Sequence, residues 1–146
     1  MSIEPGFLDA NILVYALNVD APQCSACRSL LDAGVDPTVK LYVTSQILCE
    51  FYSIITNPRR VATVSSSAEA LDIIAAVLDL PGVQVLPIPP EAVERWMNLL
   101  RRRPVKGANI FDLQIVAAMQ ANGIQRIYTY NTADFEAFSE LAVLTP

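Results

Sequence analysis

The sequence predicts a single α/β domain over residues 1–146, in which helices flank a mostly parallel central sheet of about five strands. The main observation is an alternation along the chain. Short apolar segments of strand character are separated by longer segments whose apolar residues recur at helical spacing. The composition agrees, because 53% hydrophobic and 17% charged residues suit a chain that buries a core. No linker, repeat or apolar run long enough to cross a bilayer interrupts the pattern.

Five short apolar segments are expected to form the strands of this sheet, since each lies between helix-like or turn-rich stretches. Alternation of such strands with helices is typical of parallel sheets. The segments are GFL at 6–8, KLYV at 40–43, residues 84–86 within VQVL, RIYTY at 126–130, and LAVL at 141–144.

The helices follow from apolar spacing and from residues typical of helix ends. Asn11 is expected to cap a helix over ILVYAL, and Thr44 or Ser45 to cap one over ILCEFYSII. Ser66 and Glu69 form a capping-box pattern at the next helix start. The expected helices are ILVYAL, residues 21–33, ILCEFYSII before Pro58, the segment after Ser66, the segment after Pro90, and ANIFDLQIVAAMQANG, which Gly123 closes. The segment RRRPVKG is expected to be a loop.

The absence of histidine restricts the catalytic chemistry open to this chain. It excludes ribonucleases that use histidine as general acid or base, Ser-His-Asp and Cys-His hydrolases, and zinc sites with histidine ligands. Catalysis would therefore come mainly from carboxylates, hydroxyls, amides or a metal ion.

The three cysteines suit a reducing compartment, and the early acid without a basic leader argues against a signal peptide, so a cytoplasmic protein is expected. Cys24 and Cys27 form a lone C-x-x-C pair within an expected helix. Without histidine or a second pair they cannot complete a four-ligand zinc site. We interpret them as small helix residues, with redox or metal chemistry as the alternative.

The net charge of −5 argues against non-specific nucleic-acid binding, because phosphates repel an acidic protein. The charge is unevenly distributed, since half of the ten basic residues lie within twelve positions. This basic strip is either a surface for a phosphate backbone or a solvated helix end, where the helix dipole favours cations. Its members are Arg95, Arg101, Arg102, Arg103 and Lys106.

Acidic residues from distant parts of the sequence are expected at one edge of the sheet. Asp9 follows the first strand and Asp134 follows the RIYTY strand, while Glu50 and Asp112 lie in early turns of helices that start at the same edge. Functional groups in open parallel sheets gather beyond the carboxyl ends of the strands. Taken alone, Asp9 or Asp112 is explained equally well as a helix cap or a partner of the helix dipole.

Glu50 is the most informative acid, because it shares the apolar face of its helix with Ile47 and Ile54. A carboxylate there is unfavourable unless a cation or a proton compensates. For Asn131 and for Asp134, a role in the site and local capping of the loop are equally good explanations.

A cluster of carboxylates implies a cation, since the acids stay ionised together only when a positive charge neutralises them. Hard oxygen ligands select Mg²⁺ or Mn²⁺, and Mg²⁺ takes a few carboxylates and keeps several waters. Such an ion lowers the pKa of water and stabilises charge on a phosphate. Phosphodiester hydrolysis is therefore possible without histidine.

Four motifs span nearly the whole chain: FLDANILVYAL, TSQILCEFYSII, ANIFDLQIVAAMQANGI and IYTYNTADF. In this order they resemble the PIN-domain family and, within it, the VapC toxins of bacterial toxin–antitoxin pairs. The resemblance implies a parallel-sheet PIN fold and a Mg²⁺- or Mn²⁺-dependent endoribonuclease that cleaves RNA. It also implies a cognate VapB-type antitoxin and, commonly, a homodimer.

The resemblance also assigns roles to individual residues. Asp9, Glu50 and Asp112 match the three firm acids of the family, as metal ligands and catalytic residues. The position two after Thr129 is often Asp in the family and is Asn131 here, with Asp134 three residues later, so the fourth ligand is open between these two. The accessory positions, which hold waters or orient ligands, are Asn11 and Thr129, and the expected RNA contacts are Arg101, Arg102, Arg103 and Lys106.

Two other interpretations use the same residues. Haloacid-dehalogenase-type phosphatases also place an Asp after the first strand and use magnesium, but they require a second Asp where this chain has Asn11. These phosphatases also require a Lys before the later acids. Lys106 is the only late lysine here, and it lies in an expected loop. The third possibility is a catalytically inactive PIN relative that acts as a binding module, against which the intact acids argue.

Overall fold

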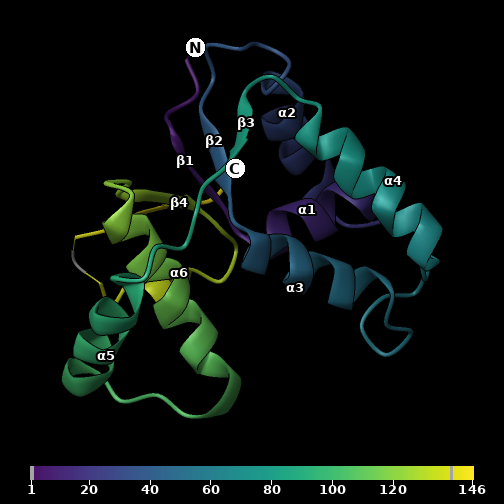
Figure 1. Ribbon diagram of the computed structural model, residues 1–146. Coiled ribbons are helices and arrows are strands. Elements are labelled where there is room, and N and C mark those ends of the chain that lie inside the picture. Colours follow the sequence, from purple (N-terminus) through teal and green to yellow (C-terminus); the bar gives the residue numbers. More distant parts are fainter. Residues whose placement is uncertain (1, 139) are drawn as a thin grey trace.

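The computed structural model describes residues 2–138 and 140–146, and its five strands form one parallel sheet (Figure 1). The strand order is β3-β2-β1-β4-β5, and every neighbouring pair is parallel. This arrangement confirms the predicted α/β class and the number of strands. The strands are β1 Gly6–Leu8, β2 Leu41–Val43, β3 Val83–Val85, β4 Arg126–Tyr128 and β5 Ala142–Leu144.

Helices connect the strands and lie on both sides of the sheet. In the view of Figure 1, α1 to α4 lie to one side of the strands and α5 and α6 to the other. Within the described residues these helices are α1 Ala10–Leu17, α2 Cys24–Ala33, α3 Ser45–Ile55, α4 Ser67–Leu78, α5 Ala92–Arg102, the 3-10 helix η1 Gly107–Asn109, α6 Ile110–Ala121 and α7 Thr132–Phe135. None of the described helices has the length and apolar character needed to cross a membrane.

Several of the predicted helix ends are confirmed by their caps. Thr44 caps α3 by accepting a hydrogen bond from the Ile47 amide at 3.3 Å. Ser66 and Glu69 form the complete capping box of α4. Gly123 follows α6 with a φ of +71°, which a glycine adopts without the strain that a side chain would add.

Two predicted helix boundaries are wrong. Asp9, and not Asn11, caps α1, because its Oδ1 accepts from the Ala10 amide at 2.7 Å and Asn11 already lies inside the helix. Helix α5 runs through Arg102, so part of the expected RRRPVKG loop is helical. Arginine is a good helix former and the last turn of a helix favours cations, so the loop begins only at Arg103.

One helix and one strand are shorter than predicted by two residues or more. The helix expected from residue 21 begins at Cys24, after a turn in which the Cys24 amide donates to the Ala21 carbonyl at 3.1 Å. Strand β4 ends at Tyr128, and the hydroxyl of the next residue, Thr129, donates to Asp9. Cys24 and Cys27 are both buried on α2 and no disulfide joins them.

The core encloses the central strand, all of whose residues are buried. Large side chains from β1, α3 and α6 fill the space between sheet and helices, among them Phe7, Phe51, Leu113 and Met119, each with no more than 1% of its surface exposed. Burial of a large apolar side chain contributes about 1.5–3 kcal/mol, so this core fixes the helices firmly on the sheet. The end of β1 is therefore a rigid position in the middle of the fold.

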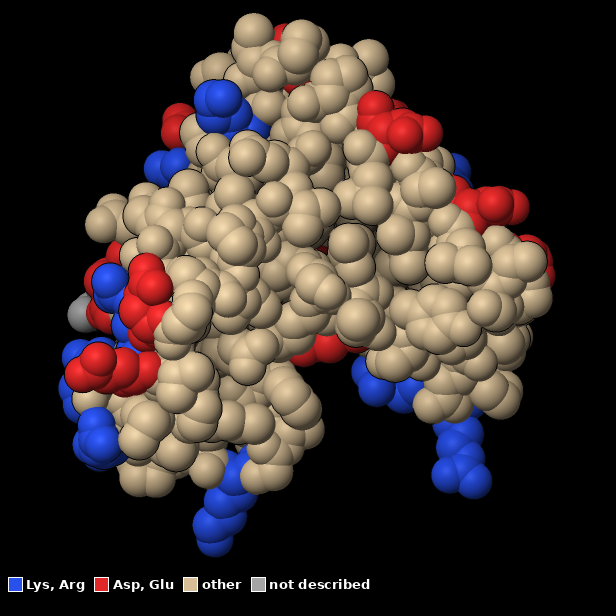
Figure 2. Space-filling model, in the orientation of Figure 1, with Lys and Arg blue, Asp and Glu red and all other residues tan. Residues whose placement is uncertain are grey.

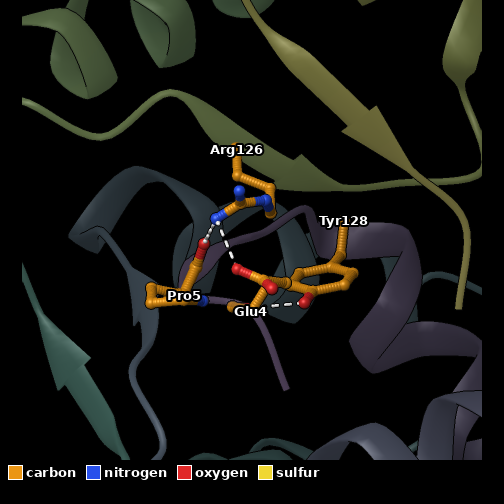
Figure 3. A network of polar contacts seen from close by, with 4 residues as sticks. All are labelled: Glu4, Pro5, Arg126 and Tyr128. Carbon is orange, nitrogen blue, oxygen red and sulfur yellow. Dashed lines mark hydrogen bonds and ion pairs between the residues drawn. The ribbon is translucent and has the colours of Figure 1, made fainter. Parts of the chain in front are cut away.

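A polar network fastens the amino ends of β1 and β4 (Figure 3). Arg126 donates to the Pro5 carbonyl at 2.9 Å and lies 3.5 Å from the Glu4 carboxylate. The Tyr128 hydroxyl donates to the Glu4 carbonyl at 2.6 Å. The ion pair itself adds little because it is largely exposed. The network holds the segment before β1 against β4, at the edge of the sheet opposite Asp9.

Candidate active site

Asp9 stands at the carboxyl end of the central strand and is the most buried acid of the predicted site, with 6% of its surface exposed. Its amide continues the sheet by donating to the Tyr128 carbonyl at 3.0 Å. Since β1 has β2 and β4 as neighbours, helices that follow or precede these strands begin close to Asp9. The carboxylate is thus placed by the topology at the middle of the sheet edge.

Thr129 and Asn11 hold one oxygen of the Asp9 carboxylate. The Thr129 hydroxyl donates to Asp9 Oδ2 at 2.8 Å, and Asn11 Nδ2 donates to the same atom at 3.2 Å. Asn11 Oδ1 accepts from the Tyr130 amide at 3.2 Å, which also ties the turn after β4 to α1. The structure therefore brings both predicted accessory residues onto Asp9, whose side chain they orient.

Glu50 and Asp112 reach the same edge on two different helices. Helix α3 starts directly after β2, so Glu50 lies in its second turn beyond the carboxyl end of that strand. Helix α6 runs back toward the start of β4, so its first turn, with Asp112, lies at the edge where β4 ends. Both side chains are half-buried.

The pKa of Asp112 is raised by burial and by the acids around it. Burial, and then the negative charges of Asp134, Asp9 and Glu50, raise it from 3.8 to about 7. Burial also raises the pKa of Asp9, although its hydrogen bonds from Thr129 and Ala10 act in the opposite direction. The pKa of Glu50 is raised by burial and by the charge of Asp9, against a hydrogen bond from a neighbouring glutamine. Acids from four separate elements therefore repel one another.

The electrostatics favour Asp134 over Asn131 as the fourth acidic position. Asp134 lies on α7, and its charge raises the pKa of both Asp9 and Asp112. Asn131 is the N-terminal cap residue of α7, and its side chain is exposed without a capping hydrogen bond. The backbone amide of Asn131 instead donates to Thr129 Oγ1 at 3.0 Å. Asn131 thus stabilises the turn, while Asp134 adds charge to the cluster.

The donor set fits a hydrated divalent cation. Among the described residues, no group of three or more acidic or cysteine side chains is arranged so that it could hold a metal ion. The ion pairs found in that part of the chain involve Glu4 and Glu140, so none neutralises the four acids of the site. Mg²⁺ needs no closed cage, because it binds one or two carboxylates directly and keeps several waters. An open cluster of mutually repelling carboxylates is therefore suited to Mg²⁺ or Mn²⁺.

Gln46 was not predicted as a site residue, yet it contacts the site directly. Its Nε2 donates to Glu50 Oε1 at 2.8 Å and to the Phe111 carbonyl at 3.2 Å. The first contact has a sequence signal, since residues four apart on a helix share a face. The second joins residues 65 positions apart, and no sequence pattern predicts it.

The expected RNA-contact residues are exposed and surround the end of α5. Arg101 donates to Asn98 Oδ1 at 2.6 Å, and Arg102 lies 3.9 Å from the Glu140 carboxylate. Arg103 and Lys106 are exposed between α5 and η1. Figure 2 shows basic side chains projecting on both sides of a hollow in the lower edge of the molecule, where acidic atoms are visible. No hydrogen bond or ion pair in the described chain joins these four residues to the site acids.

Comparison with known proteins agrees with this architecture. Residues 6–141 match the PIN domain family. Ribonuclease VapC24 of Mycobacterium tuberculosis is 24% identical over 139 residues, which cover 95% of this chain and 94% of that protein. The alignment therefore extends over nearly the whole length of both chains.

Two solved structures share the fold. The Mycobacterium tuberculosis toxin VapC20, which cleaves the sarcin–ricin loop, superposes with a TM-score of 0.70 at 18% identity and covers 96% of this chain and 98% of its own. VapBC2 from Rickettsia felis, bound to a promoter DNA fragment, gives a TM-score of 0.70 at 15% identity. The match covers 98% of this chain and 99% of that chain. Since the family match extends over nearly all of the sequence, the chain belongs to the PIN domain family.

Proposed function

We propose that this protein is a metal-dependent endoribonuclease that hydrolyses RNA phosphodiester bonds, and that it is the toxin of a VapBC-type toxin–antitoxin pair. The proposal is supported most by the charges of Asp134, Asp9 and Glu50, which raise the pKa of Asp112, while no Lys or Arg of the described residues forms an ion pair with any of these four acids. Membership in the PIN domain family and the likeness to a VapC ribonuclease support the same activity.

The four acids would hold the ion, and each has a distinct setting. Asp9 is rigid because Ala10, Thr129 and Asn11 bind both of its oxygens. Asp112 would hold the ion as a carboxylate, since a bound cation would offset the charges that raise its pKa. A bound Mg²⁺ or Mn²⁺ supplies Lewis-acid stabilisation of the phosphate and a water of lowered pKa. The half-buried Glu50 and the exposed Asp134 would complete the cluster of negative charges.

A single-stranded RNA substrate suits the surroundings of the acids. Phe111 precedes Asp112 directly, and 48% of its surface is exposed. It is the one aromatic residue among the large exposed apolar side chains of the described chain. Unpaired bases stack on such rings. Arg103 and Lys106, in the loop that leads to α6, are positioned in the sequence to bind the phosphate backbone near the same residue.

The proposed partners are an antitoxin and a second copy of the chain. Helices α4 and α5 each expose large apolar side chains, which on soluble proteins mark contact surfaces. These are Leu71, Leu78, Val93 and Met97. Light scattering of the isolated protein tests the homodimer, and co-purification with the product of an adjacent open reading frame tests the antitoxin.

The decisive experiment compares RNA cleavage by the wild type in Mg²⁺, by the wild type in EDTA, and by Asp9→Ala in Mg²⁺. We expect cleavage only in the first. Asp32→Ala, an exposed acid on α2, is the matched control and is expected to cleave as the wild type does. Equal cleavage in all of these reactions would refute the proposal. Turnover of a small phosphomonoester without RNA cleavage would indicate a phosphatase, and failure to bind Mn²⁺ in calorimetry would indicate a binding module.

A further inference from the structure

Gln46 occupies the junction between the two helices that carry Glu50 and Asp112. We propose that it is a positioning residue, which fixes the Glu50 carboxylate and ties α3 to the first turn of α6. Its consequence for catalysis rests on the function proposed above, whereas its consequence for metal binding can be measured without any RNA.

The first observation is the bond to Glu50. Gln46 Nε2 donates to Glu50 Oε1 at 2.8 Å, and this is the one hydrogen bond of that carboxylate in the described chain. A free glutamate loses considerable rotamer entropy when it is held in one position. The side-chain amide of Gln46, one turn earlier, already restricts the Glu50 carboxylate in the metal-free protein. Less rotamer entropy is then lost when an ion binds.

The second observation is the bond to α6. The same Nε2 donates to the Phe111 carbonyl at 3.2 Å, one residue before Asp112. Helix α6 packs mainly on α5, and α3 packs mainly on α1 and α4, so helix packing alone does not set the spacing between Glu50 and Asp112. The Gln46 amide links the two helices directly where their acids face the site.

The third observation is a buried acceptor. Gln46 Oε1 is buried and has no hydrogen-bond partner in the described part of the chain. The reverse orientation of the amide is excluded, because it would place an oxygen against both the Glu50 carboxylate and the Phe111 carbonyl. An unsatisfied buried acceptor is unfavourable by about 1–3 kcal/mol. The waters that Mg²⁺ retains are strong donors, so a hydrated ion at this site would satisfy Oε1.

The test uses Gln46→Met, which keeps the length of the side chain and removes its amide. Calorimetry with Mn²⁺ alone is expected to show affinity about tenfold or more below that of the wild type, as for other residues that orient metal ligands. In RNA cleavage we expect kcat to fall by a similar factor while KM changes less than about twofold, because the Gln46 amide is bonded to Glu50 and to the Phe111 carbonyl and acts through them. Gln46→Asn keeps the amide on a shorter side chain and is expected to lose less.

Gln120→Met is the matched control. Gln120 also donates to a glutamate across elements, at 3.2 Å to Glu140, but lies far along α6 from Asp112. The Gln120→Met variant should bind Mn²⁺ as the wild type does. Mn²⁺ affinity of Gln46→Met and Gln46→Asn equal to that of the wild type would overturn the positioning role, even if the wild type cleaves RNA. If both variants bind Mn²⁺ weakly but no protein cleaves RNA, the positioning role stands and the ribonuclease proposal fails.

Discussion

Replacing Asp112 by Asn should stabilise the metal-free protein at neutral pH while it weakens metal binding. The side chain keeps its size and loses its charge, so the variant removes both the burial of a carboxylate and its repulsion by Asp134, Asp9 and Glu50. Such a gain is expected where a cluster of like charges exists for function and not for stability.

The structure sets the size and the sign of this effect. A difference of one in pKa corresponds to about 1.4 kcal/mol, so a rise from 3.8 to about 7 would amount to roughly 4 kcal/mol for a fully buried group. Asp112 is half-exposed, and solvent screening reduces the expected gain to roughly 1–2 kcal/mol. Between pH 4 and 7 the folded protein retains the Asp112 proton that the unfolded chain has released. The stability of the wild type therefore falls as pH rises through this range and levels off above pH 7.

Urea denaturation in EDTA at pH 5.5 and pH 7.5 measures the effect. The gain from Asp112→Asn should be larger at pH 7.5, where the wild-type carboxyl is mostly ionised. The chain has no histidine, so no unperturbed side chain titrates midway between these values, and Asp9 and Glu50, whose pKa values are also raised, are present in both proteins. Excess Mg²⁺ should stabilise the wild type, by about 2.7 kcal/mol at a hundredfold excess over Kd, and leave the variant nearly unchanged. A variant that is less stable than the wild type at pH 7.5 in EDTA would contradict the reasoning.

Three further predictions concern other parts of the molecule. Phe111→Ala should raise KM for single-stranded RNA about tenfold with kcat retained, because a stacked base contributes about 1–3 kcal/mol; an unchanged KM would exclude stacking. Lys106→Ala should lower the salt dependence of RNA binding by about one phosphate contact, whereas Lys40→Ala, exposed before β2, should not; equal slopes in a salt titration would argue against the loop as an RNA contact. Gly123→Ala should lower the free energy of unfolding by about 1–2 kcal/mol, since its φ is +71°, and a denaturation midpoint equal to that of the wild type would contradict this.

Local signals predicted most of the fold. Thr44 and the Ser66–Glu69 pair form their capping hydrogen bonds with residues three positions away. Because these contacts are local, the two helix starts are correctly predicted. The errors arose where two local signals compete. Asp9 and Asn11 both suit a helix start, and only the end of β1 decides that Asp9 takes the cap. At the end of α5, the proline of RRRPVKG favours a loop while the arginines before it favour a helix, and the helix extends to Arg102.

The sequence by itself determined the parallel sheet and the absence of histidine chemistry, and it predicted Asp9, Glu50 and Asp112 as acids of the site, because strand ends and helix starts place them at one edge. Only the tertiary structure decided which fourth residue adds charge and what orients Glu50. Asp134 acts on Asp112 through space, and Gln46 reaches Phe111 across 65 positions of sequence. Charge repulsion and hydrogen bonds depend on distance in the folded chain, and periodicity along the sequence carries no information about that distance.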